Sequence, residues 1–458
     1  MVITRFAPSP TGNLHIGGAR TALFNFLYSK NQNGKFLLRI EDTDSERSKK
    51  EFENQIISSL KWLGINFDDK EIYQSKNISK HIEVAKELLK NNHAYKCYCL
   101  PEELEQERNQ AMAKGLNYIY SGKCRNLKEE KNIPFVIRLK VEKDKKIILY
   151  DGVQGNVEIN TNTIEDFIIL RSDNSPTYNL SASVDDKIMN ISHVIRGDDH
   201  KINAIKQIIL FQFMGWKIPK YFHIPLIHSP EGKKLSKRDN VSTTDDYKKI
   251  GILPIALRNY LLRLGWSYKD KEIFNNEESI KFFNLKNIGK SPSKLDFERI
   301  RSLNEYYIKN LNQKELFNYL IIFIDEFKKK IEENYLKIIC ENLNILKNKA
   351  KTLEDIYNNS RFIFEYDQTL ILKSNLITEK NKVYLRDFIE EISKIQNYSE
   401  KNIIEISEVV LKKNNIKFKE LGEPLRMILT GSSKAPSIKE IVKILGINET
   451  IARLRQYI

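Results

Sequence analysis

The first forty residues alternate between β-type and helical patterns. Residues 2–6 form a short β-type run that ends at the turn-forming cluster 8–12. Residues 17–27 carry apolar side chains at helical spacing, and a second β-type run covers residues 36–40. Strand, helix and strand in this order make a βαβ unit, so the chain is predicted to open a parallel sheet.

The α/β pattern is interrupted and then resumes. From about residue 77 the sequence no longer follows the opening alternation of strand and helix patterns, and this stretch is interpreted as an insertion. Strands are expected at residues 193–196 and 224–227, with a helix at 203–214 between them. Beyond residue 250 the pattern is mostly helical, rich in Lys, Glu, Ile and Leu.

The chain carries a large positive charge. It has 458 residues, 75 Lys and Arg, and a formal net charge of +15. Such a balance fits a polyanion-binding protein, and it equally fits the Lys-rich usage of an AT-rich genome. No secretory signal or membrane span is visible, and four cysteines in so long a chain do not form a disulfide framework. We therefore expect a cytoplasmic, soluble protein without a membrane partner. A monomer is a separate expectation.

A glycine-rich turn precedes the first expected helix. Gly12, Gly17 and Gly18 allow the backbone to approach a ligand closely, and free N–H groups at the helix start face anions. His15 can hydrogen-bond to phosphate oxygens. An ordinary strand-to-helix turn with a surface histidine is the alternative, and this segment alone does not exclude it.

A cluster of cations lies roughly 220 residues later. Lys233, Lys234, Lys237 and Arg238 fall within six residues, and Leu235 and Ser236 separate them. Mobile lysines suit a pyrophosphate whose charge grows as it leaves, although a solvated charge run is the usual reading of such a cluster. No Walker A sequence is present. Together with the His15 segment, this loop indicates one ATP site where the α-phosphate is attacked and pyrophosphate departs.

Several blocks, in this order, resemble the bacterial glutamyl-tRNA synthetases, which are class I aminoacyl-tRNA synthetases. The blocks are RFAPSPTG (5–12), HIGGARTA (15–22), RIEDTD (39–44), VIRGDDH (194–200), KLSKR (234–238), and PLR (424–426) with LTG (429–431). Gly18 replaces the second histidine of the class-wide HIGH motif, and KLSKR is a variant of KMSKS. The resemblance spans nearly the whole chain.

The resemblance implies an α/β fold with four parts. These are a Rossmann-like class I catalytic domain (residues 1–76 and 172–232), an inserted acceptor-binding domain (77–171), a KMSKS loop with a helical linking domain (233–310), and an α-helical anticodon-binding region (311–458). It also implies ligation of L-glutamate to tRNA(Glu) through glutamyl-adenylate, with release of AMP and pyrophosphate. ATP would enter with Mg²⁺, and activation would depend on bound tRNA. Charging of tRNA(Gln) as well stays open.

The resemblance also assigns residues to roles. The catalytic residues would be His15, Lys234 and Lys237. ATP would be bound by Gly12, His15, Gly17, Gly18, Leu235, Ser236 and Lys237. Glutamate would be bound by Arg5, Ala7, Ser9, Glu41, Tyr178 and Arg196. A planar guanidinium suits the side-chain carboxylate, and Glu41 would take the α-ammonium.

A metal site is predicted inside the insertion. Cys97, Cys99, Tyr120 and Cys124 resemble the zinc site of the shorter glutamyl-queuosine relatives, and three thiolates with a phenolate complete a tetrahedron. The alternative is three reduced cysteines without a metal.

Three other functions compete with the synthetase hypothesis. A glutamyl-queuosine synthetase would lack the C-terminal half, and this chain extends some 200 residues past Arg238. A small nucleotidyltransferase would lack that half and the Glu41 and Arg196 pocket. A non-catalytic RNA-binding paralogue would have lost His15, Lys237 or Arg196, and all three are present.

Overall fold

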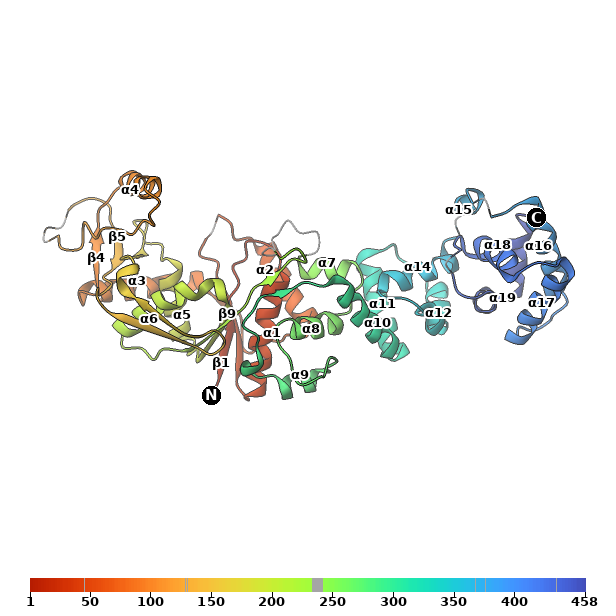
Figure 1. The fold of residues 1–458 in the computed structure, drawn as a ribbon, viewed down its shortest axis with the longest axis horizontal. Helices are drawn as coiled ribbons and strands as arrows, with labels where there is room; N and C mark the ends of the chain where they lie inside the picture. The colour runs from red at the N-terminus through yellow and green to blue at the C-terminus, as the bar shows by residue number, and fades with distance from the viewer. Residues whose placement is uncertain are drawn as a thin grey trace. The chain divides into compact units, whose positions relative to one another are not determined.

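The computed structural model describes residues 1–44, 46–127, 129, 131–232, 242–366, 368–374, 376–433 and 435–458. These residues form two compact units, shown as ribbons in Figure 1. The first unit comprises residues 1–246 and 258–296, and the second comprises residues 247–257 and 297–458.

The first unit opens with the predicted βαβ arrangement. Strand β1 (Ile3–Phe6) pairs in parallel with β2 (Lys35–Ile40), and helix α1 (Ile16–Asn31) connects them. Strand β3 (Ile72–Tyr73) continues the sheet in parallel on the other side of β2. The prediction of a parallel opening is therefore confirmed, and the carboxyl ends of β1 and β2 lie at one edge, where ligand sites of α/β folds form.

A second sheet has the order β7-β6-β10-β9. Strands β6 (Lys146–Asp151) and β7 (Gly155–Asn160) form an antiparallel hairpin, whereas β10 (Lys220–Ile224) is parallel to both β6 and β9 (His193–Gly197). The backbone N–H of Ser192 donates to the carbonyl of Ile3 at 3.0 Å. This bond places the start of β9 beside β1.

The predicted strand at residues 224–227 has wrong bounds. Strand β10 ends at Ile224, and the short β11 (Ile227–His228) begins after Pro225 and pairs with β12 (Ser293–Lys294). Proline has no N–H to donate to a neighbouring strand, so a ladder is interrupted there.

The insertion contains a third, antiparallel sheet. Its strands are β4 (Ala94–Cys97), β5 (Val136–Leu139) and β8 (Ile168–Leu170), in the order β4-β5-β8. Ile137 and Leu139 of this sheet share one buried hydrophobic cluster with Val184 and Ile205. The inner part of the insertion is therefore continuous with the core of the first unit.

Helices complete the first unit. They are α2 (Lys50–Trp62), α3 (Ile78–Lys90), α4 (Pro101–Ala113), α5 (Tyr178–Ile188), α6 (Lys201–Phe213) and α9 (Asn276–Phe282), with 3-10 turns η1 (Gln74–Asn77), η2 (Thr161–Thr163), η3 (Asp198–His200) and η4 (Leu285–Asn287). Helices α7 (Thr244–Lys249) and α8 (Pro254–Arg263) each contribute residues to both units.

The second unit is helical throughout its described residues from 297 onward. Its helices are α10 (Phe297–Asn310), α11 (Gln313–Phe327), α12 (Glu333–Glu341), α13 (Leu343–Leu346), α14 (Leu353–Phe364), α15 (Gln368–Leu372), α16 (Glu379–Ile392), α17 (Glu400–Asn414), α18 (Phe418–Thr430) and α19 (Ile438–Arg455). Among the described residues, no helix has both the length and the apolar character that crossing a membrane requires.

Candidate active site

A cavity of about 480 Å³ lies at the carboxyl ends of β1, β2 and β9. Phe6 ends β1, Glu41 follows β2, and Gly197 ends β9, and all three line the cavity. Nine of the residues predicted to bind ATP or glutamate also line it: Arg5, Ala7, Ser9, His15, Gly17, Gly18, Glu41, Tyr178 and Arg196. The structure thus brings the two predicted groups of residues into one cavity.

One end of the cavity is formed by the start of α1. His15 is the N-cap residue of this helix, and its Nδ1 accepts a hydrogen bond from the backbone N–H of Gly17 at 3.1 Å. A Cβ atom on Gly18 would lie 3.2 Å from a methyl carbon of Leu14, so glycine lets the first turn pack closely there. A helix start that lines a cavity is suited to a phosphate. Gly12 is not among the described residues that line this cavity.

Lys234, Leu235, Ser236 and Lys237 lie outside the described residues. Described residues that precede that segment line the cavity, and one that follows it bonds to the start of α1. Leu226 and Ile227, which precede it, line the cavity wall. Ser242, which follows it, accepts a backbone hydrogen bond from Ile16 at 3.0 Å.

Arg196 is held by three hydrogen bonds. Its Nε donates to Nε2 of His223 at 3.2 Å, one terminal nitrogen donates to the hydroxyl of Tyr178 at 3.3 Å, and the other donates to the carbonyl of His200 at 3.3 Å. Burial raises the pKa of Tyr178, so its phenol stays protonated and able to donate. The guanidinium and this hydroxyl form a site for a carboxylate.

A buried cluster of charges lies beside the cavity, and Arg5 and Glu41 of this cluster line it. Arg5 donates to both carboxylate oxygens of Asp186, at 3.1 and 3.4 Å. Arg39 has no exposed side-chain surface; it donates to Asp186 at 2.5 Å and to Glu41 at 3.0 Å. Two arginines and two carboxylates therefore alternate beside the cavity.

The cluster shifts the acidity of its two carboxyls in opposite directions. Burial raises the pKa of Glu41, and the nearby Arg39 only partly opposes this. Burial also acts to raise the pKa of Asp186, but Arg5 and Arg39 together outweigh it and hold that pKa below its ordinary value. Asp186 is thus a fixed anion, whereas Glu41 takes up a proton more readily.

Sequence reasoning missed Arg39, Asp186 and His223, and it missed Asp151, whose carboxylate lies 2.5 Å from Nδ1 of His223. One signal for Arg39 was available, because Arg39 and Glu41 are two residues apart at the end of a strand and so share a face. Nothing in the local sequence points to Asp186, which is separated from Arg5 by 181 positions.

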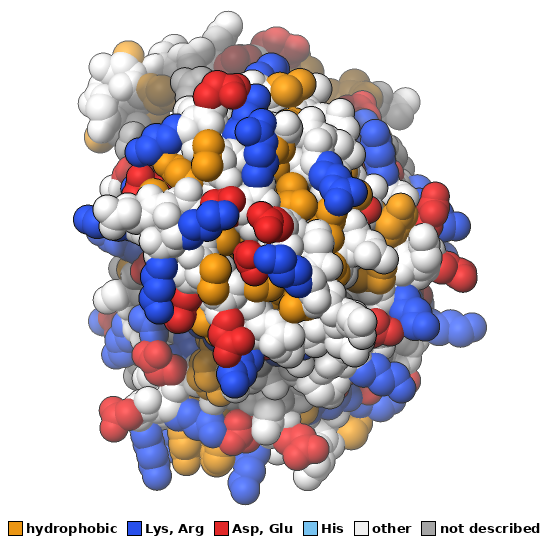
Figure 2. Space-filling view, turned by 90° about the vertical axis from the view of Figure 1, so that its right-hand side faces the viewer, with side chains coloured by type: hydrophobic (Ala, Val, Ile, Leu, Met, Phe, Trp, Pro, Cys, Tyr) orange, Lys and Arg blue, Asp and Glu red, His pale blue; other side chains and the backbone are white. Residues whose placement is uncertain are grey.

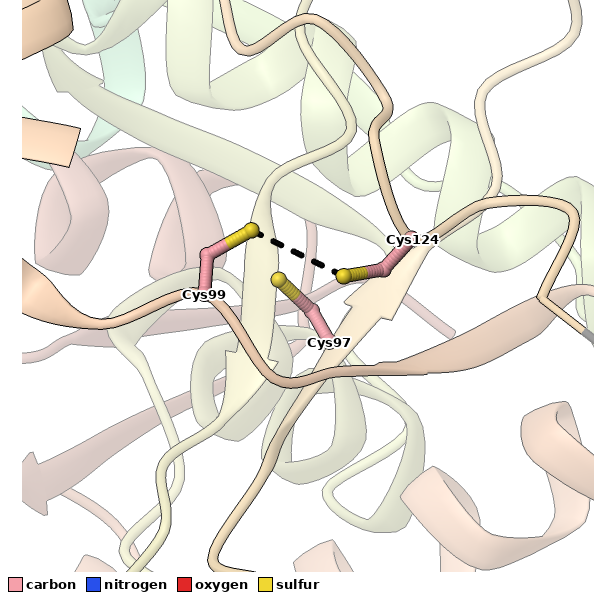
Figure 3. A group of neighbouring side chains, drawn as sticks. All are labelled: Cys97, Cys99 and Cys124. Atoms are coloured by element: carbon pink, nitrogen blue, oxygen red, sulfur yellow. Dashed lines mark hydrogen bonds between the residues drawn. The ribbon is translucent and has the colours of Figure 1, made fainter. Parts of the chain in front are cut away.

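The cysteines predicted to bind a metal meet in the insertion. The Sγ atoms of Cys97, Cys99 and Cys124 all lie within 4.8 Å of one another, and Figure 3 shows the three side chains converging. Sγ of Cys99 and Sγ of Cys124 are 3.6 Å apart. The Tyr120 hydroxyl lies 3.4 Å from Sγ of Cys97 and 3.5 Å from Sγ of Cys99. Three sulfur atoms of the predicted set thus converge, and the Tyr120 hydroxyl lies beside two of them while it accepts a hydrogen bond from the backbone N–H of Cys124 at 3.1 Å.

The pKa values of Cys97, Cys99 and Tyr120 are shifted in different directions. Burial acts to raise the pKa of the Cys97 thiol, but hydrogen bonds from Tyr120 and the Cys99 backbone, with Arg138, lower it overall. Burial raises the pKa of Cys99 to about 11. Burial and the two thiols raise the pKa of Tyr120. A metal at this point has to displace protons from Cys99 and Tyr120.

Two family models cover nearly the whole chain. Residues 1–302 match the catalytic domain of class I tRNA synthetases (E and Q), and residues 312–458 match an anticodon binding domain. The fold therefore combines a class I synthetase catalytic domain with a helical anticodon-binding domain.

Similar full-length proteins carry the same name. The chain is 55% identical to the glutamate–tRNA ligase of Pelagibacter ubique, covering 99% of this chain and 98% of that protein. It is 42% identical to glutamate–tRNA ligase 1 of Orientia tsutsugamushi over 99% and 96% of the two chains. The solved glutamate–tRNA ligase of Elizabethkingia meningosepticum, in complex with its amino acid, superposes with a TM-score of 0.85 at 31% identity, covering 100% and 99% of the two chains. This chain belongs to the glutamate–tRNA ligases, a family of class I aminoacyl-tRNA synthetases.

Proposed function

We propose that L-glutamate binds between Arg196 and Glu41. The side-chain carboxylate accepts hydrogen bonds from Arg196, Tyr178 and Arg5, and the carboxylate of Glu41 holds the α-ammonium. The observation that carries this assignment is that all four side chains line one cavity of about 480 Å³. Ala7 and Ser9 line the same cavity and complete the pocket.

We place ATP at the start of α1. The backbone N–H of Gly18 and the side chain of His15 bind phosphate oxygens, and Gly17, whose own N–H donates to His15, lets them approach the backbone, with Gly12 in the preceding turn. Lys234 and Lys237, with Leu235 and Ser236 between them, are assigned to the leaving pyrophosphate, because KLSKR resembles the KMSKS motif of the family. Mg²⁺ enters with the ATP.

The reaction then has two steps. An oxygen of the glutamate α-carboxylate attacks the α-phosphorus of ATP, the bond to the β-phosphate oxygen breaks, and pyrophosphate leaves. A ribose hydroxyl at the tRNA terminus then attacks the carbonyl carbon of glutamyl-adenylate, and AMP leaves. The protein contributes positioning and charge stabilisation and supplies no covalent nucleophile.

The test is replacement of Arg196 by leucine. Removing a guanidinium aimed at a buried carboxylate should cost about 3–5 kcal/mol, so kcat/KM for glutamate should fall by about a hundredfold or more in ATP–pyrophosphate exchange with tRNA. R47L is the matched control, because Arg47 is an exposed arginine paired with Asp44. Unchanged kinetics for glutamate in R196L would remove Arg196 from the pocket.

The tRNA anticodon is assigned to a cavity in the second unit. A cavity of about 890 Å³ there is lined by Arg301, Lys349, Lys351 and Arg426, among other residues. Lysines and arginines neutralise phosphates, and guanidinium groups contact base edges. The face of the second unit in Figure 2 instead mixes basic with acidic side chains, so its charge is not of one sign.

Charging of purified tRNA(Glu) and tRNA(Gln) separately decides which tRNAs are substrates.

The proposal also divides the chain into functional parts. We place acceptor-arm binding in residues 77–171, the linking domain in residues 233–310 and anticodon binding in residues 311–458. A single chain acting as a monomer carries all these parts.

A structural zinc ion is assigned to the Cys97, Cys99, Tyr120 and Cys124 cluster. The convergence of three Sγ atoms within 4.8 Å of one another supports this assignment. A closed four-ligand site leaves no position for a reacting water, so the ion would hold the loops of the insertion together.

A further inference from the structure

His223 lies beside Arg196 without lining the cavity. The two residues are directly opposite each other on the parallel strands β10 and β9. The side chain of His223 has no exposed surface, and its Nε2 accepts the hydrogen bond from Nε of Arg196 at 3.2 Å. On the other side of the ring, Nδ1 lies 2.5 Å from a carboxylate oxygen of Asp151.

The chain of bonds fixes which ring nitrogen carries hydrogen. Nε of a guanidinium can only donate, so Nε2 of His223 must be an acceptor without hydrogen. Nδ1 of the neutral ring then carries the hydrogen and donates it to Asp151. Burial lowers the pKa of His223, which keeps the ring neutral and Nε2 free of a proton.

Asp151 is itself held by the backbone. One of its oxygens accepts from the N–H groups of Val153 at 2.9 Å and Gln154 at 2.8 Å, and the other accepts from the N–H of His223 at 3.1 Å. Tyr221 stacks on the His223 ring with an interplanar angle of 2°, and the Arg196 guanidinium carbon lies 5.6 Å from the Tyr221 ring centre. The plane of the His223 ring is thus fixed on two sides.

We propose that Asp151 and His223 act as a positioning pair that sets the orientation of the Arg196 guanidinium and thereby the affinity for the glutamate side chain. A guanidinium has five N–H groups. Among the described residues, the bonds to His223, Tyr178 and His200 use Nε–H and one N–H of each terminal nitrogen, which leaves one N–H on each terminal nitrogen. These two N–H groups suit the two oxygens of one carboxylate. The inference rests on the proposed role of Arg196 in glutamate binding.

The test compares two replacements of His223. In H223Q, the longer side chain carries an amide oxygen to about the position of Nε2, where it accepts from Arg196. In H223N, the shorter amide reaches Asp151 but not Arg196. We expect H223N to raise KM for glutamate about tenfold or more, the effect of losing one hydrogen bond to a charged group, and H223Q to restore most of the affinity. KM for ATP should change little in either variant.

H193N is the matched control. His193 is a buried histidine on β9 in the same sheet and is not among the described residues that line the cavity. Its replacement should leave KM for glutamate unchanged. Equal rises in KM for glutamate in H223N, H223Q and H193N would show a general effect on the sheet and would overturn the proposal.

A double variant separates this proposal from the pocket assignment. If His223 acts through Arg196, H223N should add little to the loss already caused by R196L. Losses that multiply in the double variant would overturn the positioning role. If R196L itself leaves KM for glutamate unchanged, the pocket assignment fails first; a normal H223N beside an impaired R196L overturns the positioning pair alone.

A measurement on the unchanged protein covers the case in which the variants do not fold. Nitrogen-15 NMR of the full chain with labelled histidine reports which ring nitrogen carries hydrogen. The proposal requires a neutral His223 with hydrogen on Nδ1. A ring protonated on Nε2 at neutral pH could not accept from Arg196 and would overturn it.

Discussion

Arg39 donates a hydrogen bond to Glu41 across 3.0 Å, although both side chains are buried. Arg39 also donates to Asp186, which in turn binds Arg5. Arg39 therefore binds Glu41, which is proposed to hold the α-ammonium of glutamate, and Asp186, which in turn binds Arg5 of the same pocket. Because none of these groups can be hydrated fully, the two arginines offset the buried negative charge of Glu41, Asp186 and Asp185, the last of which lies 4.0 Å from Nε of Arg39.

Replacing Arg39 with methionine should destabilise the protein strongly. The change leaves Glu41 and Asp186 as buried carboxylates without their shared cation, and breaking such pairs costs about 3–5 kcal/mol. Chemical denaturation measures the loss in the free energy of unfolding. R47M serves as the control, because an exposed pair like Arg47 with Asp44 contributes about 0–1 kcal/mol. An R39M protein as stable as the wild type would contradict the balance of charges described here.

Glutamate binding should weaken as the pH falls. Burial raises the pKa of Glu41 above the ordinary value of 4.5, so its carboxylate is lost at a higher pH than an exposed glutamate would lose it. The neutral form cannot pair with the α-ammonium, so KM for glutamate should rise as the pH is lowered, and the rise should begin at a higher pH than for an exposed glutamate. E41Q should bind weakly at all pH values and show a flatter profile. The same pH dependence in E41Q and the wild type would assign the effect to another group.

Replacing Lys237 with alanine should slow adenylate formation. Losing one well-placed charge at the departing pyrophosphate costs about 10²–10³ in rate. Single-turnover formation of glutamyl-adenylate measures this step, and the Kd for tRNA should stay near the wild-type value. K220A is a control, because Lys220 is an exposed lysine at the start of β10. If K237A formed the adenylate normally but bound tRNA weakly, Lys237 would be assigned to tRNA binding and not to the pyrophosphate.

Lysines of the cavity in the second unit should contribute to tRNA binding. K349A should weaken the binding of tRNA, and a lost phosphate contact should reduce the slope of log K against log salt by about 0.9. K347A is the matched control, because Lys347 donates to the carbonyl of Lys309 and is not among the described residues that line that cavity. Affinity of the full protein should fall steeply with salt. An affinity independent of salt would indicate that the net charge of +15 reflects codon usage alone.

Metal analysis of protein purified without chelator should find about one zinc ion per chain. C124S should lose the ion, lower the stability of the insertion and raise KM for tRNA more than KM for ATP. C340S should keep the zinc, since Cys340 belongs to α12 in the second unit. Metal-free wild-type protein with full charging activity would refute the zinc assignment and leave the synthetase family unaffected.

The opening of the fold could be predicted because its signals are local. The spacing of apolar residues in 17–27 and the turn cluster 8–12 are enough to place β1, α1 and β2. The break at Pro225 could also have been anticipated, because proline cannot donate to a ladder. Short motifs shared with the synthetase family were enough to group nine residues that line the cavity of the first unit.

The supporting residues could not be predicted in the same way. Asp186 is 147 positions from Arg39, and Asp151 is 72 positions from His223. No periodicity or spacing connects residues so distant, and their pairing depends on which strands and helices become neighbours. Among these pairs, only Arg39 and Glu41 are close in the sequence. They are two residues apart at the end of a strand, so their side chains lie on the same face.

The separation of Arg5 from Asp186 has a consequence for synthesis of the protein on the ribosome. Translation proceeds from the N-terminus, so Arg5 and Arg39 are made well before Asp186, with all of residues 77–171 in between. Until Asp186 emerges, Arg5 lacks the carboxylate that binds it in the folded protein, and of its two main partners Arg39 has only Glu41. The nascent first unit therefore cannot close its glutamate pocket early, and the insertion must be made before that pocket is complete.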